Sequence, residues 1–138
     1  MSELHESAAS LRFFGDDLDP EEVTRLLGQQ PTVGARKGGI WHTSRGAEKR
    51  AHRGQWRLQC EQRSPGDLDG QIAELFATLT TDLAIWNDLC RRFQADVFCG
   101  LFLNEFNEGI SLSHETLTAV GSRGLILDLD IYRKDDKD

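Results

Sequence analysis

The sequence predicts an α+β two-layer sandwich, in which helices cover one face of a mostly antiparallel sheet. Segments 55–61 and 125–132 alternate apolar and polar side chains, as strands with one buried face do. Segments 68–79 and 83–93 instead repeat apolar side chains at the helical spacing. The chain has 138 residues, of which 38% are hydrophobic, so we expect one hydrophobic core and a single domain spanning residues 1–138.

The order of the predicted elements is ferredoxin-like, with one extra helix and one extra strand at the C-terminal end. The first strand is predicted at 11–14, where a Phe-rich stretch is stopped by Gly15 and two aspartates. In the helix that follows, Asp19 is a suitable N-cap and Pro20 fits the first helical position. Gly28 supplies the residue type that commonly ends a helix.

Glycine and proline interrupt the segment 29–54, which is predicted to be a Gly-rich basic loop region. The one element expected inside it is a short strand at 40–43. We expect this strand to form a hairpin with the alternating strand at 55–61.

The middle of the chain predicts two helices and a central strand. One long helix and two helices are both compatible with the apolar spacing, but adjacent Thr80 and Thr81 favour a break. The strand at 95–103 is apolar on both faces, which indicates either a central position in the sheet or a second face that is covered. Gly100 leaves room for a ligand, but a close packing contact or a bulge is the favoured interpretation.

The C-terminal part predicts a short helix capped by Ser113 and a final strand at 125–132. Asp128 and Asp130 lie on the polar face of this strand. They resemble paired carboxylates, but ordinary solvent-facing residues give the same pattern and are favoured. Residues 1–9 and 133–138 are expected to be disordered.

The chain resembles a bacterial family known only as a domain of unknown function. The matching features, most of them around the first helix, are Leu18-Asp19-Pro20, Leu27-Gly28, Pro31-Thr32, Lys37-Gly38, Trp41, Trp56 and a closing Asp130-Ile131-Tyr132. The resemblance implies one domain over nearly the whole chain. Because the family has no established activity, the resemblance assigns no functional residue.

Charge is distributed unevenly along the chain. Sixteen Lys and Arg against 23 Asp and Glu give a net charge of −7, which argues against a general nucleic-acid binder. Residues 36–57 hold seven Lys and Arg and one acid, so this segment carries +6 and the remainder −13. Two tryptophans and two histidines are interleaved with its cations, a combination that suits contact with a phosphate, a nucleotide or a single strand of nucleic acid. The candidate ligand-binding residues are therefore Arg36, Lys37, Trp41, His42, Arg45, Arg50, Arg53, Trp56 and Arg57.

The competing interpretation of this segment is a solvated basic loop whose two tryptophans belong to the core. Charge runs usually mark solvated surface, and this interpretation is favoured.

No catalytic, metal-binding or cofactor-binding signature occurs, so no catalytic residue, metal ligand or cofactor is expected. Cys60, Cys90 and Cys99 are widely spaced and are expected to be reduced core thiols. No apolar run approaches the roughly 18 to 20 residues of a membrane span, and the N-terminal segment lacks a secretory signal. We therefore expect a soluble, cytoplasmic protein with no membrane contact.

Two functions are compatible with these observations. The preferred hypothesis is a non-enzymatic protein-binding domain, for example an immunity or accessory protein whose acidic surface engages a basic partner. The alternative is a domain that binds a small anionic ligand or nucleotide through residues 36–57. Nucleic acid is not an expected partner in either case.

Overall fold

The computed structural model describes residues 2–133. In chain order, its elements are β1 (Ser2–Glu3), β2 (Glu6–Gly15), α1 (Pro20–Leu27), β3 (Val33–Ala35), β4 (Ile40–His42), β5 (Glu48–Arg50), β6 (Gly54–Gln59), α2 (Leu68–Ala77), α3 (Leu83–Arg92), β7 (Gln94–Leu103), β8 (Glu108–Gly109), α4 (His114–Ser122) and β9 (Ile126–Arg133). None of the helices in this range is long and apolar enough to cross a membrane.

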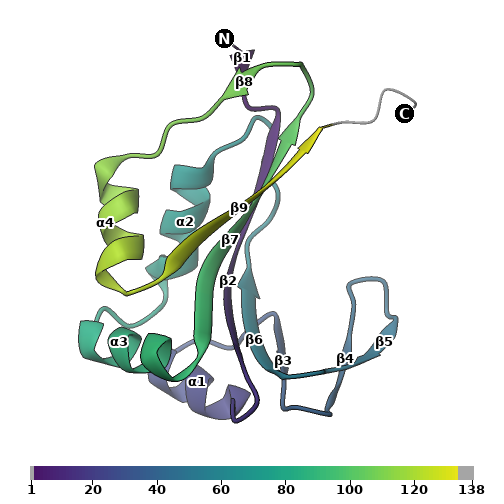
Figure 1. The fold of residues 1–138 in the computed structure, drawn as a ribbon, viewed down its shortest axis with the longest axis vertical. Helices are drawn as coiled ribbons and strands as arrows, with labels where there is room; N and C mark the ends of the chain where they lie inside the picture. Colours follow the sequence, from purple (N-terminus) through teal and green to yellow (C-terminus); the bar gives the residue numbers. More distant parts are fainter. Residues whose placement is uncertain (1, 134–138) are drawn as a thin grey trace.

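The main sheet has five strands in the order β3-β6-β2-β7-β9, and the α+β prediction is confirmed. Its pairs are antiparallel except β7 with β9, which is parallel. The ferredoxin-like order holds for four strands of this sheet, β2, β3, β6 and β7. Its second strand is β3 rather than the predicted segment 40–43, and α4 and β9 extend the sheet beside β7. Figure 1 shows the helices on one side of the sheet and the β4–β5 hairpin on the other.

The core lies between the sheet and the helix layer. Leu11 and Phe13 of β2 point into it and are fully buried, as are Trp56 of β6 and Trp86 of α3. The Phe13 ring lies 5.9 Å from Trp56 and 6.3 Å from Trp86, measured between ring centroids. Aromatic pairs at this spacing stabilise a core beyond their buried area.

Side-chain caps begin each of the four helices in the described range, because the first backbone N–H groups of a helix lack partners within it. The predicted caps Asp19 and Ser113 accept hydrogen bonds from the backbone of Glu21 and Thr116. The predicted break after α2 is also confirmed, since Asp82 caps α3 as a separate helix.

The N-terminal segment corrects the expectation of disorder at 1–9. Within it, residues 2–3 form β1, and β2 begins at Glu6 rather than at residue 11. Leu4 is 2% exposed and Ser7 is fully buried. The small side chains of 7–10 carry little hydrophobic signal, but backbone pairing to β7 holds them in the sheet.

Two further expectations about strands are wrong. The segment 29–54 contains the expected strand at 40–43, which is β4, but it also contains β3 and β5, which were not expected. In addition, β4 pairs with β5, whereas β6 lies between β3 and β2. The alternation of a strand identifies its buried face but not its neighbour. At the other end of the chain, Arg133 belongs to β9, and 134–138 lie outside the described residues.

A buried glutamine joins α2 to the sheet. Gln71 is fully buried, and its Oε1 accepts a 2.6 Å hydrogen bond from the Ser7 hydroxyl. Its Nε2 donates to the backbone oxygens of Ser7 and Glu61 at 3.0 and 2.9 Å. The Ser7 hydroxyl in turn accepts from the backbone N–H of Asp67, the cap of α2.

We expect Gln71→Leu to lower the free energy of unfolding by about 2 to 4 kcal/mol, because it leaves several buried polar groups without partners. Urea unfolding measures this change. Gln30→Leu is the matched control, since Gln30 is exposed and its replacement is expected to change stability by less than about 0.5 kcal/mol. Equal effects of the two substitutions would contradict this role for Gln71.

A second polar contact joins α2 to α4. The Asp69 carboxylate accepts from the Thr116 hydroxyl at 2.5 Å and from the Ser113 backbone N–H at 3.1 Å. These hydrogen bonds, the one from Thr116 above all, lower the pKa of Asp69 below its ordinary value.

Because the folded-state pKa of Asp69 is lowered, its carboxylate stabilises the fold fully above the unfolded pKa of about 4 and less as the pH falls through the folded pKa. We expect the wild type to be more stable than Asp69→Asn at pH 7, with a difference that disappears in this acidic range. Urea unfolding of both proteins across pH tests this, and a difference independent of pH would contradict it.

Candidate functional site

The sheet face opposite the helices carries the candidate site. Successive side chains of a strand point to opposite faces, so the residues between the core positions of β2 lie on this face. They are Ala8, Ser10, Arg12 and Phe14. The neighbouring strands add Arg57 and Gln59 from β6, Phe98, Gly100 and Phe102 from β7, and Asp128, Asp130 and Tyr132 from β9.

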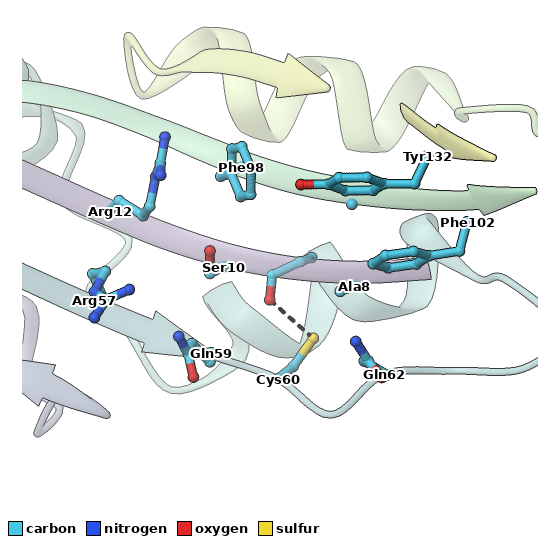
Figure 2. A pocket seen from close by; sticks show the side chains of 12 residues that line it. Ala8, Ser10, Arg12, Arg57, Gln59, Cys60, Gln62, Phe98, Phe102 and Tyr132 are labelled. Carbon is cyan, nitrogen blue, oxygen red and sulfur yellow. Dashed lines mark hydrogen bonds between the residues drawn. The ribbon is translucent and has the colours of Figure 1, made fainter. Parts of the chain in front are cut away.

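A trough of about 310 Å³ runs along this face. Ala8, Ser10 and Gly100 lie on its floor, and their small side chains account for its depth. Figure 2 shows aromatic residues from β7 and β9 along one side of the trough, and polar residues from β6 and the segment after it along the other. The aromatic wall consists of Phe98, Phe102 and Tyr132, and the polar wall of Arg57, Gln59, Cys60 and Gln62.

Gly100 allows the aromatic wall to form. A Cβ atom at this position would lie 3.1 Å from the Phe102 ring, so the missing side chain accommodates that ring. Phe102 stacks on Tyr132 with ring centroids 5.1 Å apart and planes 9° from parallel. This geometry agrees with the expectation that Gly100 makes a close packing contact. Gly100 also lines the trough, so it leaves space for a ligand as well.

Arg12 lies at one end of the trough with its charge already compensated. Its Nε and Nη2 donate to the two carboxylate oxygens of Asp96 at 2.8 and 2.7 Å, and Asp128 lies 3.7 Å from Nη2. The guanidinium also lies 4.1 Å from the centre of the Phe98 ring, a cation–π distance. The hydrogen bond to Asp96 raises the pKa of Arg12.

Arg57 has a different environment. Within residues 2–133, no acid lies within ion-pair distance of its guanidinium, and its Nε is buried without a hydrogen-bond partner. Trp41 from β4 covers it, with 4.8 Å between Cζ and the ring centre. Burial, and to a smaller extent the positive charge of Arg12, lower the pKa of Arg57, but an arginine remains protonated at neutral pH.

Arg57 and Gln59 also line a second cavity, of about 340 Å³, beneath the β4–β5 hairpin. Trp41 and His42 lie on its hairpin side, and Val33 of β3 on its sheet side. The two cavities therefore share the polar wall formed by Arg57 and Gln59.

The structure brings three of the nine predicted ligand-binding residues to these cavities: Trp41, His42 and Arg57. Trp56 is a correction, because it is fully buried and its Nε1 donates to the Thr24 hydroxyl at 3.1 Å. Its apolar ring packs in the core, where it cannot line a site that opens to solvent.

The other predicted cations mostly bond to the protein's own groups. Arg36 and Lys37 pair with Asp19 and Asp16, Arg50 donates to the Gly38 carbonyl oxygen, and Arg53 donates to Gln94. Arg45 lies exposed between β4 and β5. The basic segment thus folds into the β4–β5 hairpin and part of β6, and acids near α1 neutralise part of its charge.

Sequence reasoning missed Arg12, Phe98, Phe102 and Tyr132 as site residues. One signal was present, since the strand 95–103 is apolar on both faces and only one face can pack on helices. No such signal was present for Arg12. It lies beside Arg57 only because β2 pairs with β6, and the sequence does not show which strands pair.

Nucleophiles and metal ligands add little to the site. Burial raises the pKa of Cys99 to about 12 and that of Cys90 to about 11, so both thiols stay protonated. The Cys60 thiol, in the trough wall, donates to the Ala9 carbonyl oxygen at 3.5 Å, and burial raises its pKa as well. Residues 2–133 contain no cluster of three or more His, Cys, Asp or Glu side chains arranged to hold a metal ion.

Comparison with known proteins gives a family and no activity. No curated protein and no solved structure matches the chain. A family model with the description "Domain of unknown function (DUF4279)" matches residues 3–134, which agrees with the resemblance seen in the sequence. The match includes every strand of the main sheet and all four helices of the described range. The chain therefore belongs to the DUF4279 family.

Proposed function

We propose that this protein binds a small anionic ligand in the trough on the open face of its sheet. The observation that carries this proposal is Arg57, a half-buried guanidinium without an acidic partner in the described chain, in a wall shared by two cavities. A buried donor without a partner is unfavourable, and most such groups in folded proteins are paired. An anion in the trough can reach the terminal nitrogens of Arg57 and compensate the charge of the guanidinium, which has no acidic partner in residues 2–133.

The rest of the trough supports an organic ligand over a bare ion. Small-molecule sites combine a mostly apolar lining with a few placed polar groups. Here Phe98, Phe102 and Tyr132 offer ring surface opposite the amides of Gln59 and Gln62. We propose binding without catalysis, since the thiol in the trough wall, Cys60, is protonated and bonded to backbone.

We expect Arg57→Gln to weaken binding of phenylacetate and of phenyl phosphate about tenfold or more, the value of one charge-assisted hydrogen bond. NMR titration measures both affinities through the Gly100 amide and the Trp41 indole. Neutral phenylacetamide should bind wild type and Arg57→Gln alike. Ala8→Leu, which fills the floor of the trough, should weaken all three probes.

Arg91→Gln is the matched control for this experiment. Arg91 is an exposed arginine of α3, on the helix side of the sheet, and its ion pair with Asp88 is a surface pair worth little. If Arg57→Gln and Arg91→Gln change the affinities equally, or if the anions bind no better than phenylacetamide, the proposed site is wrong.

A second candidate function, binding of a basic protein, is favoured by the exposed edge strand β9. Leu129 is 44% exposed and Ile131 60% exposed on the helix side of this strand, while Asp128 and Asp130 point to its open side. An edge strand with exposed aliphatic side chains on one side and acids on the other suits a partner that grips the edge and is apolar and positively charged. This candidate function is the protein-binding hypothesis, with β9 as the proposed contact surface.

We expect a photo-crosslinking amino acid at Ile131 to capture a protein with a basic contact surface in the native host. With the purified partner, Leu129→Lys should weaken binding about tenfold or more, since it places a cation against a basic surface. Leu83→Lys is the control, because Leu83 is 43% exposed on α3, away from this edge. An acidic contact surface, or equal effects of the two substitutions, would contradict this candidate.

A further inference from the structure

We infer that the ligand of the trough is an amphipathic monocarboxylate, with its single carboxylate at Arg57 and its apolar or aromatic body against Phe98, Phe102 and Tyr132. This inference rests on the proposed function and names the chemical class of its ligand. Three properties of the open face support it.

The first property is that one cation at the trough is uncompensated. Arg12 and Arg57 both line it, but Arg12 is held in a bidentate pair with Asp96. A guanidinium in such a pair has its best donor edge occupied. Arg57 alone is left to neutralise a ligand, and one guanidinium matches one carboxylate in charge.

The second property is the number of carboxylates close to Arg12 on the open face. Asp96 bonds to it, Asp128 lies 3.7 Å from it, and Asp130, one position along the same face of β9, accepts a hydrogen bond from Tyr132. Counted with Arg12 and Arg57, the groups named here are three acids and two cations. Their excess negative charge repels a dianionic phosphate more strongly than a monocarboxylate, because the repulsion grows with the charge of the ligand.

The third property is the shape of the donor group at Arg57. Trp41 covers one face of the guanidinium, and the buried Nε lies out of reach of solvent. The two terminal nitrogens make no hydrogen bond to any residue between 2 and 133. Two coplanar donors suit the two oxygens of a planar carboxylate. The neutral amides of Gln59 and Gln62 beside them add no further charge.

The test compares three probes that share a phenyl ring: phenylacetate, phenyl phosphate and phenylacetamide. Affinities are measured by NMR titration of the full chain at about pH 7.5, where the phosphate is mostly dianionic because its second pKa is about 6. We expect phenylacetate to bind at least about fivefold more tightly than phenyl phosphate, a ratio typical of one extra like-charge contact near a protein surface.

Asp128→Asn tests the reason for this preference. Asp128 is largely exposed, so its replacement should leave the fold intact, and removal of its charge should improve phenyl phosphate binding more than phenylacetate binding. Asp88→Asn, on α3 in the helix layer, is the matched control and should leave the ratio unchanged. An unfolding curve for each variant confirms that the fold is retained.

The outcomes separate this inference from the proposed function. If phenyl phosphate binds as tightly as phenylacetate, or if Asp128→Asn leaves their ratio unchanged, the monocarboxylate inference is overturned, while anion binding at Arg57 stands. If neither anion binds better than phenylacetamide, the proposed function itself is overturned.

Discussion

The position of β2 between β6 and β7 is the constraint on which the rest of the structure depends. Of its ten residues, nine pair with β7 and six with β6, and the five from 10 to 14 have partners on both sides, so the backbone groups of this stretch are satisfied within the sheet. Alternation then divides its side chains between two environments. Leu11 and Phe13 enter the core, while Arg12 and the small residues around it form the open face. A shift of one residue in register would bury Arg12 and expose Phe13.

The character of the open face follows from the different environments of two arginines on adjacent strands. Arg12 is neutralised by Asp96 and stacked on Phe98, so it stabilises the β2 and β7 pair and fixes one end of the trough. Arg57 instead lies against the ring of Trp41 and has no acidic partner in residues 2–133. The β4–β5 hairpin supplies that ring and lies on the side of the sheet away from the helices (Figure 1). The hairpin is therefore a wall of the site, and it contributes to the site through Trp41 and His42 rather than through its own cations.

Much of the fold could be predicted because its signals are local. Asp19, Pro20 and Gly28 define α1 through capping chemistry that acts within a few residues. Asp82 separates α3 from α2 in the same way. The N-terminal half of β2 could not be predicted, because Ser7 to Ser10 show no hydrophobic pattern and are held by β7, about ninety residues away in sequence. The pairing of β4 with β5 was missed because β5, with three exposed polar residues, has no buried face to reveal it.

The sequence by itself determined the α+β class, the helix boundaries, the two apolar faces of β7 and the basic segment that contains Trp41 and Arg57. These properties depend on side-chain chemistry and spacing over short stretches. Only the tertiary structure decided that Arg12, Arg57, Phe98 and Tyr132 lie on one face, and that Trp56 lies in the core. Those outcomes depend on strand order and register, which arise from backbone pairing between distant segments. The free charge at Arg57 is equally a tertiary property, since it depends on which acids pairing brings near each arginine.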